Sequence, residues 1–236
     1  MADAPVWTRI RAELEEDLAA GRYGPGDRLP SEAALAVRFG VNRHTLRRAL
    51  AALAEAGLVH ARRGAGVFVT ARPTDYRIGR RTRFHQNLIA AGLTPERRIL
   101  SLETRAADAG EAAALELAPG ARVHVWEGLS MADGVPVAQF RSVFCACRFP
   151  DLKAALAETR SVTAALARAG VPDYTRRSTR LSAERADAVR ARHLRLPEGA
   201  PVLRTVAINV DGEGRPVEYG RTWFAGDRVQ LIVEPE

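Results

Sequence analysis

The stretch Val41–Gly57 reads VNRHTLRRALAALAEAG, and its pattern predicts one amphipathic helix that ends at the glycine. Leu46, Leu50 and Leu53 recur at the spacing of a single helical face, which we expect to be buried. Asn42 is of a residue type that caps helix N-termini. The first two turns of the other face carry basic side chains: Arg43, His44, Arg47 and Arg48.

Shorter elements are predicted on both sides of this helix. Apolar residues from Trp7 to Leu18 follow helical spacing, and Ser31 can cap a short helix that ends at Gly40. Residues 58–61 and 67–69 are typical of strands, and the connection 62–66 is basic and glycine-rich. We therefore expect the first part of the chain to form three helices and a hairpin.

This combination indicates a DNA-binding surface. The N-terminal residues of a helix can enter the major groove, and arginine can form two hydrogen bonds to guanine. The side chains of Ser31, Asn42 and Thr45 suit phosphate oxygens, and the hairpin tip at Arg63-Gly64 can reach a neighbouring groove. The alternative is an ordinary solvated face, because every basic residue among the 35 except Lys153 is arginine, a bias that genome composition also produces.

The composition excludes a mostly disordered chain, a collagen and a coiled coil. Of 236 residues, 47% are hydrophobic and 27% charged, as in ordinary globular proteins. The net charge is +7, and residues 42–72 carry six arginines against one acid, Glu55, which favours a polyanionic partner. The sequence has no apolar run of membrane-spanning length and no signal-peptide core, and its two cysteines cannot form a disulfide framework. We therefore expect a cytoplasmic protein without membrane contacts.

The rest of the chain contains an internal repeat. The pattern from Leu102 to Val123 recurs 79 positions later, and Gly134-x-Pro136-Val137 recurs as Gly214-x-Pro216-Val217. Each half is predicted to form strand, helix, strand, turn and strand. Two halves predict one antiparallel sheet backed by helices, an α+β fold with a ligand cleft at their junction. We expect domains at 1–70 and 83–236, joined by a linker at 71–82.

Three segments of the first domain carry a family resemblance: PGDRLPSE at 25–32, VNRHTLRRAL at 41–50, and Leu53 with Gly57-Leu58. They resemble the winged helix-turn-helix of GntR-family transcription regulators. The resemblance implies a homodimeric repressor on an inverted-repeat DNA operator. It also implies DNA contacts from Arg28, Arg43, Thr45, Arg47 and the wing around Arg63-Gly64. His44 stands where a small hydroxyl residue is usual, and we expect it to alter base preference.

Motifs of the second domain carry a further resemblance. They are Leu115-x-Leu117-x-x-Gly120, Asp133-Gly134-x-Pro136, Phe149-Pro150-x-Leu152, and Gly214-x-Pro216-Val217-Glu218-Tyr219 followed by Gly226-Asp227-Arg228. They resemble the UTRA effector domain of the HutC branch, which implies a chorismate-lyase-like fold that senses a small molecule. The segments 82–88 and 177–183 are similar to the PhnF-type subgroup, regulators of phosphonate uptake and carbon–phosphorus bond cleavage.

A small anionic effector needs arginines and hydroxyl donors that converge in a cleft. The candidates are Arg83, Phe84, Arg141, Ser161, Thr163, Glu218, Tyr219 and Arg221. Ser161 and Thr163 are expected to open a helix whose free amides favour an anion, and with Glu218 they match ligand-binding positions of sugar-phosphate-sensing relatives. Two basic residues of those relatives correspond to Gly128 and Ser130 here, a departure that argues against a sugar phosphate and leaves room for another ligand. The effector that we expect is a phosphonate, phosphate or related anion. The three arginines could instead pair with acids or lie on solvated faces.

No catalytic set, cofactor or metal site is predicted. Cys145 and Cys147 lack clustered histidine or acidic partners, so we interpret them as small packed side chains, with a redox pair as the alternative. Other functions stay open. The second domain could be a lyase-like enzyme tethered to a basic module, or the chain could coat DNA without sequence preference. It could also be a HutC-type regulator of a different catabolic pathway.

Overall fold

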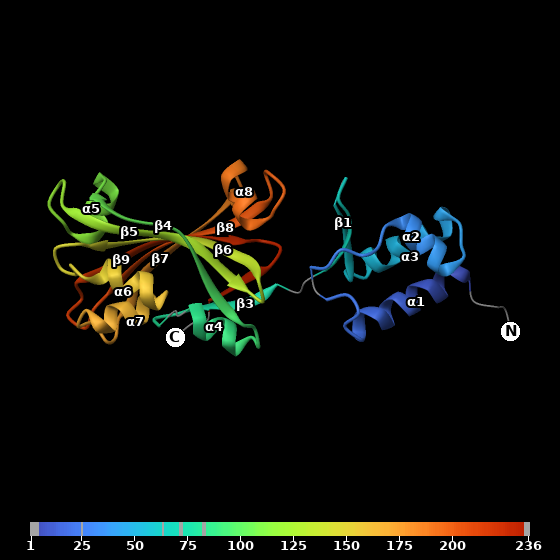
Figure 1. Cartoon of the computed structure of the whole chain (residues 1–236), viewed down its shortest axis with the longest axis horizontal. Helices are drawn as coiled ribbons and strands as arrows, with labels where there is room; N and C mark the ends of the chain where they lie inside the picture. The colour runs from blue at the N-terminus through green and yellow to red at the C-terminus, as the bar shows by residue number, and fades with distance from the viewer. Residues whose placement is uncertain (1–4, 25, 63, 71–72, 82–83, 234–236) are drawn as a thin grey trace. The chain divides into compact units, whose positions relative to one another are not determined.

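The computed structural model describes residues 5–24, 26–62, 64–70, 73–81 and 84–233. The chain divides into two units, Met1–Arg72 and Pro73–Glu236, shown in Figure 1. No helix within the described ranges is long and apolar enough to cross a membrane.

The first unit has the predicted three helices and hairpin. Its elements are α1 (Val6–Ala19), α2 (Glu32–Phe39), α3 (Arg43–Glu55), β1 (Val59–Arg62) and β2 (Gly66–Val69), and β1 and β2 pair antiparallel. Both predicted caps form, since Ser31 Oγ accepts from Ala34 N at 3.2 Å and Asn42 Oδ1 accepts from Thr45 N at 2.9 Å. The core joins all three helices through buried side chains that include Ile10, Leu14, Leu35, Leu46 and Leu53.

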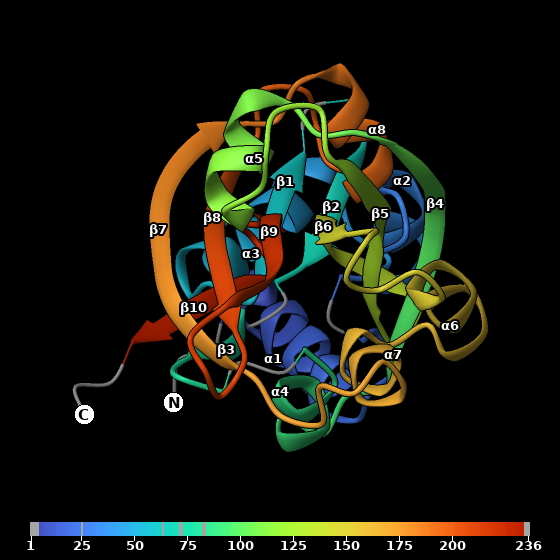
Figure 2. The ribbon, with the colours of Figure 1, turned by 90° about the vertical axis from the view of Figure 1, so that its left-hand side faces the viewer.

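The second unit is built on a six-stranded antiparallel sheet in the order β4-β5-β6-β9-β8-β7. Its strands are β4 (Pro95–Ala106), β5 (Arg122–Ala132), β6 (Val135–Cys145), β7 (Thr175–Arg185), β8 (Pro201–Val210) and β9 (Pro216–Ala225). Its helices are α4 (Phe84–Ala90), α5 (Ala109–Leu115), α6 (Leu152–Thr159), α7 (Val162–Arg168) and α8 (Ala188–Leu194). Helices α5 and α8 cover one face of the sheet and α6 and α7 the other, as Figures 1 and 2 show from two directions. The predicted α+β class is confirmed.

The internal repeat has a structural cause. In each half an aspartate caps the helix between two strands: Asp108 Oδ1 accepts from Glu111 N at 2.7 Å, and Asp187 Oδ1 accepts from Arg190 N at 2.8 Å. The halves meet where β6 pairs with β9, and the equivalent residues Arg141 and Arg221 lie directly opposite each other. The sheet therefore has an approximate two-fold relation at its centre.

The stretch that we expected to be a linker contains a strand. Residues Thr74–Ile78 form β3, which pairs in parallel with β10 (Val229–Val233). Tyr76 is buried there, with its ring 5.0 Å from that of Phe224. The sequence did not predict this short strand, because it follows Pro73, contains polar residues and pairs with a strand near the C-terminus. Of the expected linker, the structure also describes residues 73 and 79–81, outside this strand.

Candidate functional site

The first turns of α3 present the predicted basic surface. Leu46, Leu50 and Leu53 are buried, so the opposite face is open, and Arg43, His44 and Arg47 are exposed. Arg47 Nε donates to Glu32 Oε2 at 2.8 Å, which ties α3 to α2. The pair is exposed at both side chains, so water and salt screen it and a phosphate or base can compete for the guanidinium.

The polar residues expected to contact phosphate also have local roles. Thr45 Oγ1 donates to Asn42 Oδ1 at 3.1 Å, and that same oxygen caps α3. Asn42 Oδ1 is therefore occupied within the chain. Ser31 Oγ accepts from the backbone, which leaves its own proton free to be donated to a phosphate oxygen.

Arg48 also makes a contact that the sequence did not predict. Its guanidinium carbon lies 4.7 Å from the centre of the Trp7 ring on α1, a cation–π contact. The side chain thus follows the flank of α3 that packs toward α1, and it helps to join the two helices. Arg48 is exposed despite this contact, so its role in DNA binding stays a prediction.

Arg28 lies beside the hairpin. Its backbone forms an isolated antiparallel β-bridge with Phe68 of β2. A Cβ built on Gly66 would lie 2.9 Å from Arg28 Nε, so glycine at this position allows the guanidinium to lie close to the hairpin backbone. Arg28, Ser31 and Gly64 line one surface hollow of about 290 Å³. Three of the predicted DNA contacts are thus brought together, and Arg63 lies outside the described residues.

The second unit contains a polar cavity of about 260 Å³ on the α7 side of the sheet. Of the expected effector-binding residues, Phe84, Ser161, Thr163 and Glu218 line it. Residues that the sequence did not single out line it too: Tyr76, Gln86, Arg97, Phe140, Ser142, Val162, Tyr174, Arg176, Thr205, Ala207, Asn209, Gly220 and Thr222. Arg83 lies outside the described residues.

Glu218 is buried and held by neutral donors. Ser142 Oγ donates to Glu218 Oε1 at 2.6 Å, and Asn209 Nδ2 donates to Glu218 Oε2 at 2.6 Å. Across the cavity, the hydroxyls of Thr163 and Tyr174 lie 3.0 Å apart, within hydrogen-bonding distance. Burial raises the pKa of Tyr76, so its phenol stays protonated at neutral pH.

Arg97 is the main cationic residue that sequence reasoning missed. Its guanidinium carbon lies 4.4 Å from the ring centre of Phe140, 5.0 Å from that of Phe84 and 5.2 Å from that of Trp126. Within the described residues it forms no ion pair, and its buried Nε has no hydrogen-bond partner. Burial lowers the pKa of Arg97. The charge of Glu218, in the same cavity, opposes this shift, but the two side chains form no ion pair, so an anionic ligand can supply the direct ionic contact.

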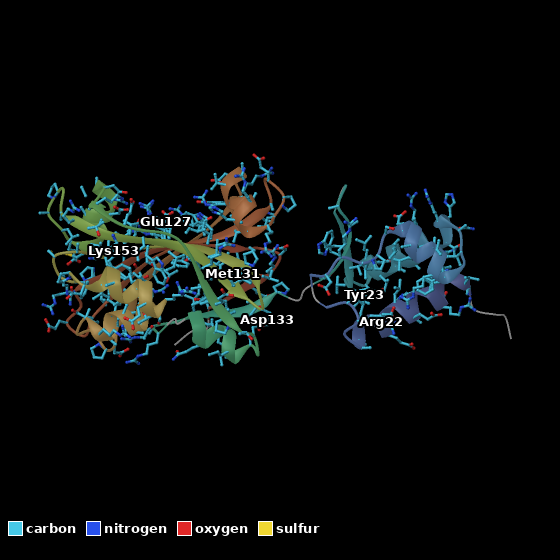
Figure 3. The ribbon with its side chains drawn as sticks, in the orientation of Figure 1. Arg22, Tyr23, Glu127, Met131, Asp133 and Lys153 are labelled. Atoms are coloured by element: carbon cyan, nitrogen blue, oxygen red, sulfur yellow. The ribbon has the colours of Figure 1, made fainter. Side chains whose placement is uncertain are left out.

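Three expected effector-binding residues do not line the cavity. Successive side chains of a strand point to opposite faces, so Glu218 and Gly220 face the cavity while Tyr219 and Arg221 face the α5 and α8 side. Arg221 Nε donates to Tyr219 Oη at 3.2 Å on that side. Arg141 pairs there with Glu111 at 3.0 Å and with Glu127, labelled in Figure 3, at 3.4 Å.

The other candidate chemistry adds no site. Cys145 is buried and Cys147 exposed; both are free thiols, with the sulfur atoms 2.8 Å apart. No group of three or more histidine, cysteine or acidic side chains arranged to hold a metal ion occurs in the described part of the chain.

Comparison with known proteins identifies both units. The model of the "Bacterial regulatory proteins, gntR family" matches residues 7–69, and the UTRA domain model matches residues 90–230. HTH-type transcriptional regulator RB1450 of Rhizobium meliloti (strain 1021) is 40% identical over 97% of this chain and 94% of its own length. The probable transcriptional regulator PhnF of Escherichia coli (strain K12) is 35% identical over the same shares.

The crystal structure of PhnF from Mycobacterium smegmatis is also similar, with a TM-score of 0.68 and 27% identity over 96% of this chain and 99% of that one. These relatives are regulators, so the enzyme alternative is not supported. The chain belongs to the GntR family of bacterial regulatory proteins, with a helix-turn-helix region followed by a UTRA domain.

Proposed function

We propose that this protein is a DNA-binding transcriptional repressor whose operator affinity is controlled by a small anion held in the cavity of the second unit. Residues 1–70 would be the DNA-binding domain, and residues 83–236 would bind the effector and form the homodimer. Two copies would place two α3 helices in successive major grooves of an inverted repeat in the cytoplasm. The exposed set Arg43, His44 and Arg47 supports the DNA role.

One observation carries the effector proposal: Arg97 is half-buried, its Nε is buried without a hydrogen-bond partner, and it forms no ion pair among the described residues. Partial burial of a charge without an ion pair costs free energy that a bound anion can offset. The hydroxyls of Ser161 and Thr163 line the same cavity and can donate to a tetrahedral anion. Since the chain is similar to PhnF along most of its length, we propose a phosphonate-related anion and control of phosphonate-metabolism genes.

The effector can change DNA binding only through a difference in its affinity for the DNA-binding and released states of the dimer. We propose that the anion favours the released state. A direct test is footprinting of the purified protein on DNA upstream of its own gene and of phosphonate genes in the same genome. Protection of one inverted repeat, relieved by millimolar methylphosphonate or phosphate, is expected. Uniform weak protection without a preferred site would contradict the proposed specificity.

A further inference from the structure

The cavity holds charges of both signs, none of which contacts a counter-ion within the described residues. Arg176 Nε donates to Asn209 Oδ1 at 2.8 Å and its Nη1 donates to Thr179 Oγ1 at 3.2 Å, both neutral acceptors. Glu218 receives its hydrogen bonds from Ser142 and Asn209, both neutral donors. Arg97 is stacked on aromatic rings. Each charge is therefore stabilised by dipoles or rings and keeps its capacity for an ionic partner.

Asn209 keeps the opposite charges apart. Its carbonyl oxygen accepts from Arg176, and its amide nitrogen donates to Glu218. The two bonds fix the orientation of the amide, because a reversed amide would face the guanidinium with a donor and the carboxylate with an acceptor. An arginine and a glutamate that lined the cavity only for stability would be expected to pair directly. Here the amide of Asn209 lies between Arg176 and Glu218 and forms a hydrogen bond with each. Arg97 is a second cation in the same cavity.

A ligand that carries only negative charge does not match this arrangement. It would satisfy Arg97 and Arg176 but would face the Glu218 carboxylate, which lines the same space of about 260 Å³. Like charges in such a small, partly desolvated site repel strongly. The lining carries two cations and one anion, so a doubly charged phosphonate joined to one ammonium would balance it. The volume lies below the range of drug-sized sites, which selects a short molecule.

We propose that the effector is a short zwitterion in which a phosphonate group contacts Arg97 and Arg176 and an ammonium group donates to Glu218. This inference rests on the proposed function, since it names the chemical class of the proposed effector. Glu218 is then the residue that distinguishes aminoalkylphosphonates from simple phosphonates and inorganic phosphate.

The test compares matched probes by isothermal titration of the full chain: 2-aminoethylphosphonate, 2-hydroxyethylphosphonate and ethylphosphonate. They share the anion and differ in the group offered to Glu218. We expect the amino compound to bind about tenfold or more tightly than ethylphosphonate, as a charge-assisted hydrogen bond would give. The hydroxyl compound should fall between them. This comparison uses the unaltered protein and does not depend on the folding of a variant.

The Glu218→Gln variant supplies the second arm, with exposed Glu158→Gln as the matched control. Glu218→Gln should bind the amino and ethyl compounds equally, and the control should keep the preference. Equal binding of all three probes by the unaltered protein, or tightest binding of the hydroxyl compound, overturns the ammonium site but leaves an anion-controlled regulator. Binding of none of the three overturns the proposed phosphonate effector as well.

Discussion

Ser142 Oγ lies 2.6 Å from Glu218 Oε1 and donates a hydrogen bond to it, which joins the two central strands of the sheet. Ser142 is opposite Gly220 in the β6–β9 pairing, so Glu218, two residues earlier, shares its face. Each strand belongs to a different half of the internal repeat. The bond therefore fixes a carboxylate of the second half by a hydroxyl of the first, at the wall of the cavity.

Ser142→Ala should destabilise the protein by about 1–3 kcal/mol, because it removes a donor from a buried carboxylate. It should also weaken binding of 2-aminoethylphosphonate, since Glu218 is less well oriented. Urea unfolding and titration calorimetry measure the two effects. Ser101→Ala is the control, because Ser101 is an exposed serine on β4. Equal stability of the two variants would mean that the Ser142 bond contributes nothing measurable.

Arg47→Ala should lower affinity for the cognate operator by about 1–3 kcal/mol while affecting random DNA much less, if Arg47 bonds a guanine. The Glu32 pair is exposed and weak, so its loss should hardly change folding stability. Fluorescence anisotropy with operator and scrambled duplexes measures the ratio. Arg9→Ala, an exposed arginine on α1, controls for lost positive charge. An unchanged ratio of the two affinities would rule out base reading by Arg47.

Helix α3 was predictable because the residues that define it are close together in the sequence. The spacing of Leu46, Leu50 and Leu53 identifies the buried face, and a cap at Asn42 sets where the helix begins. The α+β fold was predictable for a related reason, since Asp108 and Asp187 cap equivalent helices and mark the repeat. The contact of Arg48 with Trp7 was not predictable from local spacing, because Trp7 lies in a different helix.

The cavity could be predicted only in part. Both faces of β6 are covered by helices, so its side chains are nearly all buried or half-buried and show no alternation of apolar and polar residues. The sequence therefore could not tell which face Arg141 takes. Arg97 was missed because Phe84, Trp126 and Phe140 surround it from three separate elements. Its position among these rings, without an ion pair among the described residues, depends on tertiary contacts that no local pattern predicts.

The Glu111 carboxylate should make stability fall in acid. Burial raises the pKa of Glu111, but hydrogen bonds from Arg105 and the Asp108 amide, with the charges of Arg105 and Arg141, outweigh it and lower the pKa from 4.5 to about 2. The folded state thus holds its proton less tightly than the unfolded chain. The stabilisation, on the order of 3 kcal/mol, is complete above pH 4.5 and is lost as the pH falls toward 2.

Glu111→Gln tests this sign. The gap in free energy of unfolding between the unaltered protein and the variant should be wide at pH 7 and should narrow below pH 4.5. Urea titrations at pH 7, 5, 4 and 3 measure it. Exposed Glu158→Gln should give a small gap at every pH, because solvent screens its pair with Arg168. A Glu111→Gln gap that did not change with pH would show that the charge of Glu111 is not the source of the stabilisation.

Gly128→Ala should disturb the cavity although residue 128 does not line it. A Cβ at Gly128 would lie 2.5 Å from the Arg98 carbonyl oxygen and 2.7 Å from Phe140 Cζ, so the ring must move. That ring stacks on Arg97. We expect a loss of about 1–3 kcal/mol in stability and weaker anion binding. Gly212→Ala is the control, because nothing lies within 4 Å of its built Cβ. Thermal unfolding with and without methylphosphonate separates the two effects.

Arg97→Met should leave the ligand-free protein at least as stable as the unaltered protein while removing its response to the effector. Methionine replaces a half-buried cation, which forms no ion pair among the described residues, with an apolar chain of similar length among the rings of Phe84, Trp126 and Phe140. The desolvation cost of the charge is removed while apolar contact with the rings is kept. Differential scanning fluorimetry should then show an unchanged or higher Tm without ligand, and no shift with 2-aminoethylphosphonate. Arg98→Met, its exposed neighbour on β4, should keep the shift. A lower ligand-free Tm in Arg97→Met would mean that this guanidinium stabilises the fold, which would contradict a role confined to anion binding.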